Sequence, residues 1–184
     1  HVVIALPLNV LGDLELDFEI PTRARQVIEQ GHVGSAAKGW ATAEIPASVE
    51  SIGWPYAVEV YSRAGPFGDV VCTFAVAAPD HPHALVRSWA EVERRHRCTA
   101  LSGNFLSHDW ISDPYARGTW LSSAPGQSSG LHELANMPPP CLFAGGDISR
   151  GWYGWMEGAV TSGRDVAHRL NVFLSEGRCP VASG

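Results

Sequence analysis

The sequence predicts a mixed protein (α+β or α/β) in which an antiparallel-sheet region is followed by a strand, a glycine turn and a long helix. Three observations lead to this class. Residues 141–174 combine an apolar run, small residues and helical spacing; residues 54–77 hold two β-branched and aromatic runs around a turn; and residues 82–96 have helical spacing. The 184 residues, 45% of them hydrophobic, suffice for one core and for parts of two.

The first part of the chain is expected to begin with a strand and to continue into a helix. Residues 2–8 form a nearly continuous apolar run, which is typical of a buried strand. Residues 14–20 alternate and predict a short extended segment. A helix should follow over residues 22–30, because Pro21 suits its start and Gly31 its end.

The middle of the chain has the pattern of a sheet with one helix. The predicted elements are a strand up to Ala43, strands over 54–61, 70–77 and 99–107, and a helix over 82–96. A turn over residues 63–69 predicts that two of these strands form a hairpin. The charged residues of the helix, read as a solvated face, are Glu91, Glu93, Arg94 and Arg95.

The last part is expected to be loop over residues 122–140, apart from a helical turn over 131–135. A buried strand at 141–143, a turn and a tryptophan-rich loop at 151–155 then lead to a helix from about Met156. The apolar residues on one face of this helix are Met156, Ala159, Val160, Gly163, Ala167, Leu170 and Leu174.

The strand, the turn and the helix start form a candidate cofactor site. Gly145 and Gly146 permit a ligand to approach the backbone, Asp147 closes the turn, and the first N–H groups of a helix carry partial positive charge. The alternative is a simple tight turn beside core tryptophans, and the residues alone favour neither interpretation.

Composition excludes several classes of function. The net charge of −6 argues against nucleic-acid binding, and no apolar run approaches the roughly 20 residues that span a bilayer. The cysteines Cys72, Cys98, Cys141 and Cys179 show no C-x-x-C spacing, so we expect reduced thiols in a cytoplasmic protein. The segment 81–83 (His-Pro-His) has no partnering cluster and is interpreted as a helix start, not a metal site.

Residues 141–174 resemble the C-terminal FAD-binding signature of the flavin-containing amine oxidases, the monoamine oxidase family, and are most similar to its fungal and bacterial members. The residues in register with that signature are Asp147, Gly151, Trp152, Gly158 and Ala159. The resemblance implies the C-terminal part of this fold, with an antiparallel-sheet substrate domain and the last strand and helix of an FAD-binding domain. The implied division is 1–39 (FAD-domain strand and connection), 40–108 (substrate domain) and 109–184 (return to the FAD domain).

The same resemblance implies a set of FAD contacts. These residues are Trp110, Gly145, Gly146, Asp147, Gly154, Trp155, Met156 and Ala159. The segment HDWISDPYARGTWLSSAPG (108–126) resembles the return of the family's chain to the flavin, where Trp110 packs against the isoalloxazine. Thr119 stands where the mammalian members have a cysteine that binds FAD covalently, so the FAD is expected to be non-covalent.

The activity that the resemblance implies is oxidation of an amine to an imine. Trp120 and Trp155 match the two positions that form an aromatic cage around the amine in the family. Lys38 matches a lysine that meets the flavin N5 atom through a water, although a register six residues further on would place Glu44 there. From the residues alone, Lys38 is a solvated strand lysine.

No strand of the sequence is followed by G-x-G-x-x-G, the dinucleotide fingerprint that the family carries near its start. The sequence also opens without Met, directly on an apolar run. We therefore expect a partner, an N-terminal chain that carries this element, either as a separate subunit of a heteromer or as a cleaved part of one protein.

Two alternatives stay open. An L-amino-acid oxidase on the same fold would need an arginine to hold the substrate carboxylate, and Arg63 or Arg117 could serve. The second alternative is not an enzyme: it is a flavin-free fragment that only binds a partner chain.

Overall fold

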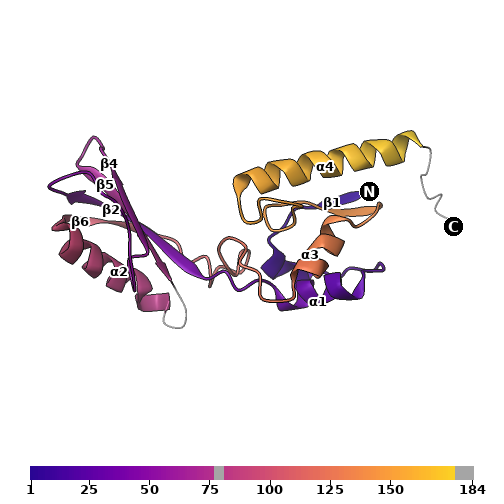
Figure 1. The fold of residues 1–184 in the computed structure, drawn as a ribbon, viewed down its shortest axis with the longest axis horizontal. Coiled ribbons are helices and arrows are strands. Elements are labelled where there is room, and N and C mark those ends of the chain that lie inside the picture. Colours follow the sequence, from indigo (N-terminus) through magenta and orange to yellow (C-terminus); the bar gives the residue numbers. More distant parts are fainter. Residues whose placement is uncertain (77–80, 177–184) are drawn as a thin grey trace. The chain divides into compact units, whose positions relative to one another are not determined.

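The computed structural model describes residues 1–76 and 81–176, and the chain divides into two compact units (Figure 1). Unit 1 comprises His1–Gly34 and Pro114–Gly184, and unit 2 comprises Ser35–Asp113. Each unit has its own sheet and its own cluster of buried apolar side chains. The chain thus leaves unit 1 once and returns to it, whereas the functional division expected from the sequence stays a prediction.

Unit 1 contains a two-stranded parallel sheet. β1 (Val2–Ile4) pairs with β7 (Cys141–Phe143), and Val3 lies opposite Leu142. These strands are far apart in the sequence, so their pairing brings the start of the chain beside the predicted glycine turn. The strand predicted at 141–143 is confirmed.

The first strand is shorter than predicted. β1 is followed by η1, a 3-10 helix over Leu8–Asp13. Pro7 has no N–H with which to continue a ladder, and Leu8 and Leu11, about one 3-10 turn apart, are both fully buried. For the predicted extended segment over residues 14–20, the structure assigns no strand, and Leu14 at its start has extended backbone angles.

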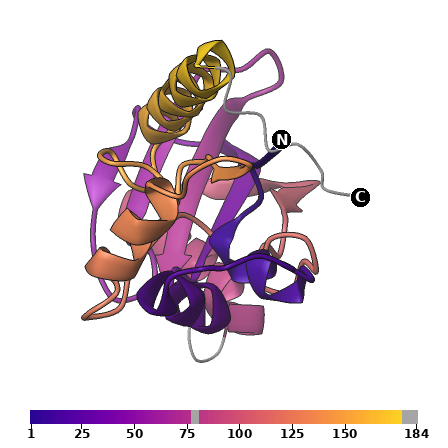
Figure 2. The ribbon, with the colours of Figure 1, turned by 90° about the vertical axis from the view of Figure 1, so that its right-hand side faces the viewer.

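Two helices pack side by side in unit 1. α1 (Thr22–Gln30) confirms the prediction, and it ends at Gly31, whose φ is +65°. α3 (Ser128–Ala135) begins earlier than the predicted helical turn. A Cβ on Gly130 would lie 2.3 Å from the Arg23 carbonyl oxygen, so the two helices approach too closely for a side chain there (Figure 2).

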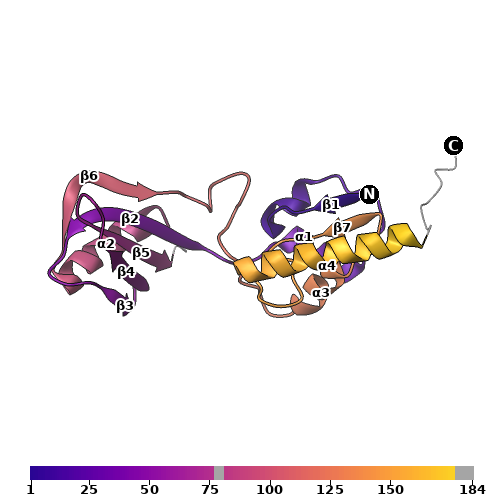
Figure 3. The ribbon, with the colours of Figure 1, turned by 90° about the horizontal axis from the view of Figure 1, so that it is seen from above.

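α4 (Met156–Ser175) begins where the sequence predicts and lies along the parallel sheet (Figure 3). Its buried residues are Gly158, Ser162 and Val166, and Val166 clusters with residues of β7 and the turn after it. The apolar face expected from the sequence is largely uncovered, because Met156 is 88% exposed and Val160 is 49% exposed. Gly158, Ser162, Val166 and the partly buried Leu170 thus form the packed face, whereas Met156 and Val160 face outward.

Unit 2 is a five-stranded sheet with one helix. Its elements are β2 (Ala36–Glu44), β3 (Glu50–Ile52), β4 (Glu59–Arg63), β5 (Asp69–Val76), α2 (His81–His96) and β6 (Thr99–Ser107). The strand order is β3-β4-β5-β2-β6, and every neighbouring pair is antiparallel. The predicted hairpin is β4–β5, and the predictions for α2 and β6 are confirmed.

Two predictions in unit 2 need correction. The strand expected over residues 54–61 begins only at Glu59, because the preceding residues form a loop whose N–H groups bind a side chain of α2. That side chain is Glu91, which is buried and not solvated. Ala77, the last residue of another predicted strand, lies outside the described residues.

The described cysteines Cys72, Cys98 and Cys141 are free thiols, and Cys179 lies outside the described residues. Within residues 1–76 and 81–176, no helix is long and apolar enough to cross a bilayer. The same residues contain no group of three or more His, Cys, Asp or Glu side chains that could hold a metal ion.

Candidate cofactor site

The glycine turn after β7 is fixed to α4. Gly145 has a φ of +142°, which other residues rarely adopt, and nothing lies within 4 Å of the place of its absent Cβ. Its N–H donates to the Ser162 hydroxyl of α4 (2.9 Å), and the Gly145 carbonyl lies 3.1 Å from the same oxygen. The Gly146 carbonyl accepts the N–H of Gly154 (2.9 Å). The turn is therefore rigidly supported and has open space beside it.

The N-terminus of α4 is available to an electron-rich group. Trp155 is the N-cap residue and makes no side-chain capping bond. The N–H groups of Met156, Glu157 and Gly158 have no intrahelical acceptor, and the Ala159 N–H is the first that has one, the Trp155 carbonyl (3.2 Å). Gly158 lies in this first turn, and a Cβ there would lie 2.3 Å from the Trp152 carbonyl oxygen. Close contact between loop and helix thus sets where these donors lie.

Two tryptophans stand on neighbouring loops. Gly154 has a φ of +74°, and a Cβ on it would lie 3.2 Å from the backbone nitrogen of Leu121. Trp155 follows Gly154 and Trp120 precedes Leu121, so both indoles adjoin this contact between loops. Trp120 is 46% exposed and Trp155 is 69% exposed. Neither indole is a core residue of unit 1, which argues against the purely structural interpretation.

Thr119, next to Trp120, holds a buried polar atom without a partner. Its N–H donates to the Gly34 carbonyl (3.1 Å), which fixes the backbone. Its Oγ1 atom is inaccessible and has no hydrogen-bond partner among the described residues. A buried hydroxyl in this state is costly, so it marks a place where a bound group would supply the missing hydrogen bond.

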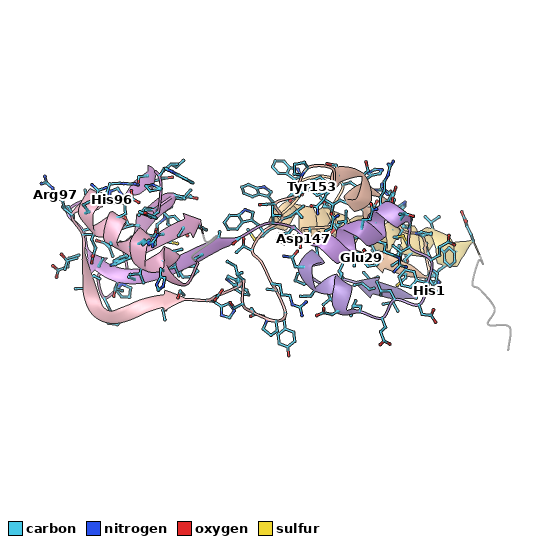
Figure 4. All side chains as sticks on the ribbon, turned by 90° about the horizontal axis from the view of Figure 1, so that it is seen from below. His1, Glu29, His96, Arg97, Asp147 and Tyr153 are labelled. Atoms are coloured by element: carbon cyan, nitrogen blue, oxygen red, sulfur yellow. The ribbon has the colours of Figure 1, made fainter. Side chains whose placement is uncertain are left out.

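Asp147, labelled in Figure 4, is anchored by the backbone and lies near a buried histidine. Its Oδ2 atom accepts the N–H of Leu8 (3.1 Å) and lies 4.0 Å from Nε2 of His32. Burial lowers the pKa of His32 more than the nearby carboxylate raises it, so the ring is neutral near pH 7. Because Nδ1 accepts the N–H of Gly34 (2.9 Å), the ring proton is on Nε2 and faces Asp147.

Asn9 ties three segments of unit 1 together around this ring. Its Oδ1 atom accepts the His32 N–H (2.6 Å), and its Nδ2 atom donates to the carbonyls of Arg117 (2.6 Å) and His32 (3.3 Å). A Cβ on Gly118 would lie 2.7 Å from Asn9 Nδ2 and 3.0 Å from His32 Cε1. We call Asn9, His32, Gly34, Gly118 and Asp147 the His32 cluster.

Two predicted site residues belong to unit 2. Lys38 is half-buried in β2, and its Nζ atom lies 4.7 Å from the ring centroids of both Trp40 and Phe74. Trp110 is half-exposed and its ring centroid lies 4.3 Å from that of His108. Lys38 is thus a strand lysine held over aromatic rings, and its relation to the site in unit 1 stays a prediction.

The structure brings the other predicted residues together in unit 1: Trp120, Gly145, Gly146, Asp147, Gly154, Trp155, Met156 and Ala159. Sequence reasoning missed His32, Asn9 and Ser162 as supports of the site. A signal was present for the first of these, because His32 lies between Gly31 and Gly34 in a GHVG segment. Paired glycines around one polar residue indicate close packing of backbone on its side chain.

A turn without side chains, an uncapped helix start and an anchored carboxylate define a site for a cofactor that has both carbonyl and hydroxyl groups. Comparison with known proteins agrees with this class. Residues 1–171 match the family described as flavin containing amine oxidoreductase, and the chain belongs to that family.

Relatives of known name cover nearly all of this chain. A pseudooxynicotine dehydrogenase of a Pseudomonas species is 29% identical over 181 residues, which are 94% of this chain and 36% of that protein. An (S)-6-hydroxynicotine oxidase of Paenarthrobacter nicotinovorans is 28% identical over 171 residues, 86% of this chain and 38% of that protein.

Solved structures show the same fold. The cyclohexylamine oxidase from Brevibacterium oxydans matches with a TM-score of 0.77 and 19% identity, over 95% of this chain and 43% of that one. A putrescine oxidase with bound putrescine matches with a TM-score of 0.66 and 22% identity, over 92% and 42%. The predicted fold class is confirmed, and the chain spans less than half the length of these relatives.

The residues of the site fit the flavin that the family implies. The orphaned Thr119 hydroxyl and the open space beside Gly145 are features that a bound group would complete. The first N–H groups of α4 suit a carbonyl oxygen that gathers negative charge, and the Asp147 carboxylate suits hydroxyl donors. The donors and acceptors are thus of the kinds that a flavin and its ribityl chain require.

Proposed function

We propose that this chain forms part of an FAD-dependent amine oxidase that converts an amine to an imine. The observation that carries the proposal is the pair of exposed tryptophans, Trp120 and Trp155, on two touching loops beside the glycine turn. When bound, the flavin supplies the acceptor for the hydride that leaves the carbon beside the amine nitrogen. The chain's own residues bind that cofactor, exclude water and orient the amine.

Each residue has a distinct role in this proposal. Trp120 and Trp155 form the walls of a slot that holds a neutral amine away from water. Gly145, Gly146, Asp147, Gly154, Met156 and Ala159 hold the cofactor. Two residues of unit 2 have roles that only the resemblance to the family supports: Trp110 is proposed to pack against the flavin ring, and Lys38 to reach the flavin through a water.

The proposed substrate is a ring-bearing or otherwise bulky amine. Broad indole walls favour large flat molecules over small polar ones. The names of the relatives agree, since they include two compounds related to nicotine and cyclohexylamine. Putrescine, named for another structure with this fold, is the linear counterexample that a substrate panel should include.

The FAD is proposed to be non-covalent. Thr119 cannot form the thioether that a cysteine forms at this position in other members of the family. Acid precipitation of the holoenzyme should therefore leave yellow flavin in the supernatant. Flavin that stays with the precipitated protein would refute this part of the proposal.

The dinucleotide-binding element is proposed to come from an N-terminal polypeptide that packs on unit 1. Support comes from the apolar surfaces that unit 1 leaves uncovered, including Val2 and Val3 of β1 and Val160 of α4. Parallel strands are ordinarily covered on both faces, and a sheet of two strands is too small to stand alone.

The enzyme is proposed to be cytoplasmic, and the buried free thiols of Cys72 and Cys98 agree with this.

A visible spectrum of the enzyme, purified with the polypeptide that carries this element, tests the proposal. Flavin absorbance that is bleached by amines under anaerobic conditions is the expected result. Bleaching by L-amino acids instead would identify the alternative oxidase, and a colourless preparation would identify a flavin-free fragment. The structure gives that oxidase little support, because Arg117 forms a two-bonded ion pair with Asp13.

A further inference from the structure

We propose that His32 is a positioning residue of the cofactor site: one ring nitrogen faces the Asp147 carboxylate, and the other supports the backbone of Thr119 and Trp120 through Gly34. The inference rests on the proposed function, since it assigns a supporting role within the same flavin site. It does not make His32 a catalytic residue, because the ring is buried within unit 1 and its nitrogens face Gly34 and Asp147.

The first step is the location of the ring. The His32 side chain is only 1% exposed, and it lies between segments that are far apart in the sequence. A Cβ on Gly34 would lie 2.8 Å from His32 Nδ1, and one on Gly118 would lie 3.0 Å from His32 Cε1. Two backbone segments therefore press on the ring, so its orientation is fixed by packing before any ligand binds.

The second step concerns Nδ1, which organises the loop with the tryptophan. Nδ1 accepts the N–H of Gly34, and the Gly34 carbonyl then accepts the N–H of Thr119. The imidazole thus fixes the peptide that fixes Thr119, and Trp120 follows directly. A change at Nδ1 should act on the slot for the amine more than on the carboxylate.

The third step concerns Nε2, which acts on the carboxylate. The ring proton on Nε2 faces Asp147 Oδ2 at 4.0 Å, a separation that a shift of about 1 Å converts to a hydrogen bond. Asp147 Oδ1 has no donor among the described residues, so this oxygen is left for a ligand. A carboxylate accepts hydrogen bonds only, so the matching ligand groups are hydroxyls such as those of a ribityl chain. His32 and the Leu8 N–H together aim this oxygen.

Two substitutions separate the two nitrogens. In His32→Asn, the side-chain oxygen can replace Nδ1 as acceptor, but nothing reaches Asp147. In His32→Gln, the terminal amide can replace Nε2–H as donor, but the acceptor beside Gly34 is lost. The experiment uses the enzyme assembled with its N-terminal polypeptide, made flavin-free and titrated with FAD by fluorescence.

We expect His32→Asn to weaken FAD binding about tenfold, with little change in the KM for the amine. We expect His32→Gln to keep FAD affinity within about threefold and to lower kcat/KM for the amine. In the Asp147→Asn background, the effect of His32→Asn on FAD affinity should largely disappear, since the partner is already neutral. His96→Asn in unit 2, where the ring binds the Ser51 hydroxyl (3.0 Å), is the matched control and should leave FAD affinity unchanged.

Equal FAD affinity and equal turnover in both variants and the wild type would overturn the inference. So would a loss of melting temperature that is the same in both variants and tracks the loss of flavin, because that is the behaviour of a merely structural histidine. A wild-type enzyme without flavin, or one that amines do not bleach, would instead refute the proposed function. The two failures are therefore distinguishable in one set of preparations.

Discussion

At the scale of single residues, the site contains side chains that are unfavourable in this chain by itself, either because they are apolar and exposed or because they are polar, buried and unpaired. Trp120 and Trp155 are large, apolar and exposed, and Thr119 holds a buried hydroxyl without a partner. Such features lower the stability of a chain by itself, so they indicate places that a bound molecule completes. Both can be tested by substitution.

Trp155→Ala in the assembled enzyme should widen the slot and shift preference toward bulkier amines, with flavin still bound. Because Trp155 is mostly exposed in unit 1, the melting temperature should change by no more than about 2 °C. Trp120→Ala should lower the rate of anaerobic flavin reduction by the best amine. An unchanged ranking of amines together with a large drop in melting temperature would show that the tryptophans are structural.

Thr119→Val should stabilise the flavin-free protein by about 1 kcal/mol, because it replaces an unpaired buried hydroxyl by a methyl group of the same shape. The same variant should bind FAD more weakly than the wild type. Thr119→Ser, which keeps the hydroxyl, is the control and should not gain stability. Thermal melts of both variants and FAD titrations decide the question, and a destabilised Thr119→Val would contradict it.

At the scale of elements, close backbone contacts and buried charge place the helices. α4 meets its loop through Gly158, and α2 is held to the loop before β4 through Glu91. In the second case the carboxylate takes two backbone N–H groups and pairs with Arg95. Both contacts join a helix to an irregular segment. Each of them leads to a prediction about the free energy of unfolding of a variant.

Gly158→Ala should destabilise this chain by about 1–3 kcal/mol, since its Cβ would lie 2.3 Å from the Trp152 carbonyl oxygen. Gly163→Ala on the same helix should instead stabilise it by about 0.5–1 kcal/mol, because nothing lies within 4 Å of the new Cβ and alanine favours the helix. Denaturant unfolding of the two variants and the wild type measures both changes in the free energy of unfolding. Equal effects would show that the packing of α4 differs from that described here.

Glu91→Gln should destabilise unit 2 at neutral pH by about 1–3 kcal/mol and much less in acid. Burial alone would raise the pKa of Glu91, but the N–H groups of Ala57 and Tyr56 and the Arg95 guanidinium together lower it. The unfolded chain therefore binds the proton more readily. The stabilisation is complete above the unfolded pKa of about 4.3 and is lost as the pH falls through the folded value.

Unfolding of the wild type and the variant between pH 3 and pH 7 measures this effect. The difference between the two proteins should shrink steadily below about pH 4. A difference that stays constant over the whole range would mean that Glu91 contributes by shape and not by charge.

At the scale of the whole molecule, the proposed function makes the described site one side of a larger one. Unit 1 supplies the glycine turn, the helix start and the two tryptophans, and the relatives are more than twice as long as this chain. The 184 residues contain no G-x-G-x-x-G, the dinucleotide fingerprint. This chain expressed alone should therefore fail to bind FAD stoichiometrically, whereas the assembled enzyme should bind it.

Equilibrium dialysis with FAD measures both preparations. Stoichiometric binding and turnover of amines by this chain alone would contradict the expectation. A second readout is the exposed apolar face of α4: a charged substitution at Val160 should disturb assembly with the N-terminal polypeptide and leave the secondary structure of this chain intact. Val86→Lys is the matched control, because Val86 is an exposed residue of α2, and it should leave assembly unchanged.

Local patterns were enough to predict much of the fold. The Pro21 start and the Gly31 stop predicted α1, and helical spacing predicted α2. The run-turn-run pattern predicted the β4–β5 hairpin, and the apolar run before Gly145 predicted β7 and the turn. These features depend on neighbouring residues, so the sequence contains them directly. The candidate site residues were predicted by resemblance to the family, and the roles of those residues stay predictions.

Only the tertiary structure decided which faces are covered and which remote residues meet. The apolar stripe of α4 was predictable, but its exposure was not, because the face that packs depends on the shape of β7 and of the turn. Glu91 looks like an ordinary polar residue until the fold brings the backbone N–H groups of Tyr56 and Ala57 to it. His32 looks equally ordinary until the fold brings Asp147 to it. Burial and pairing over long sequence separations arise from the packed fold, and no local pattern of residues encodes them.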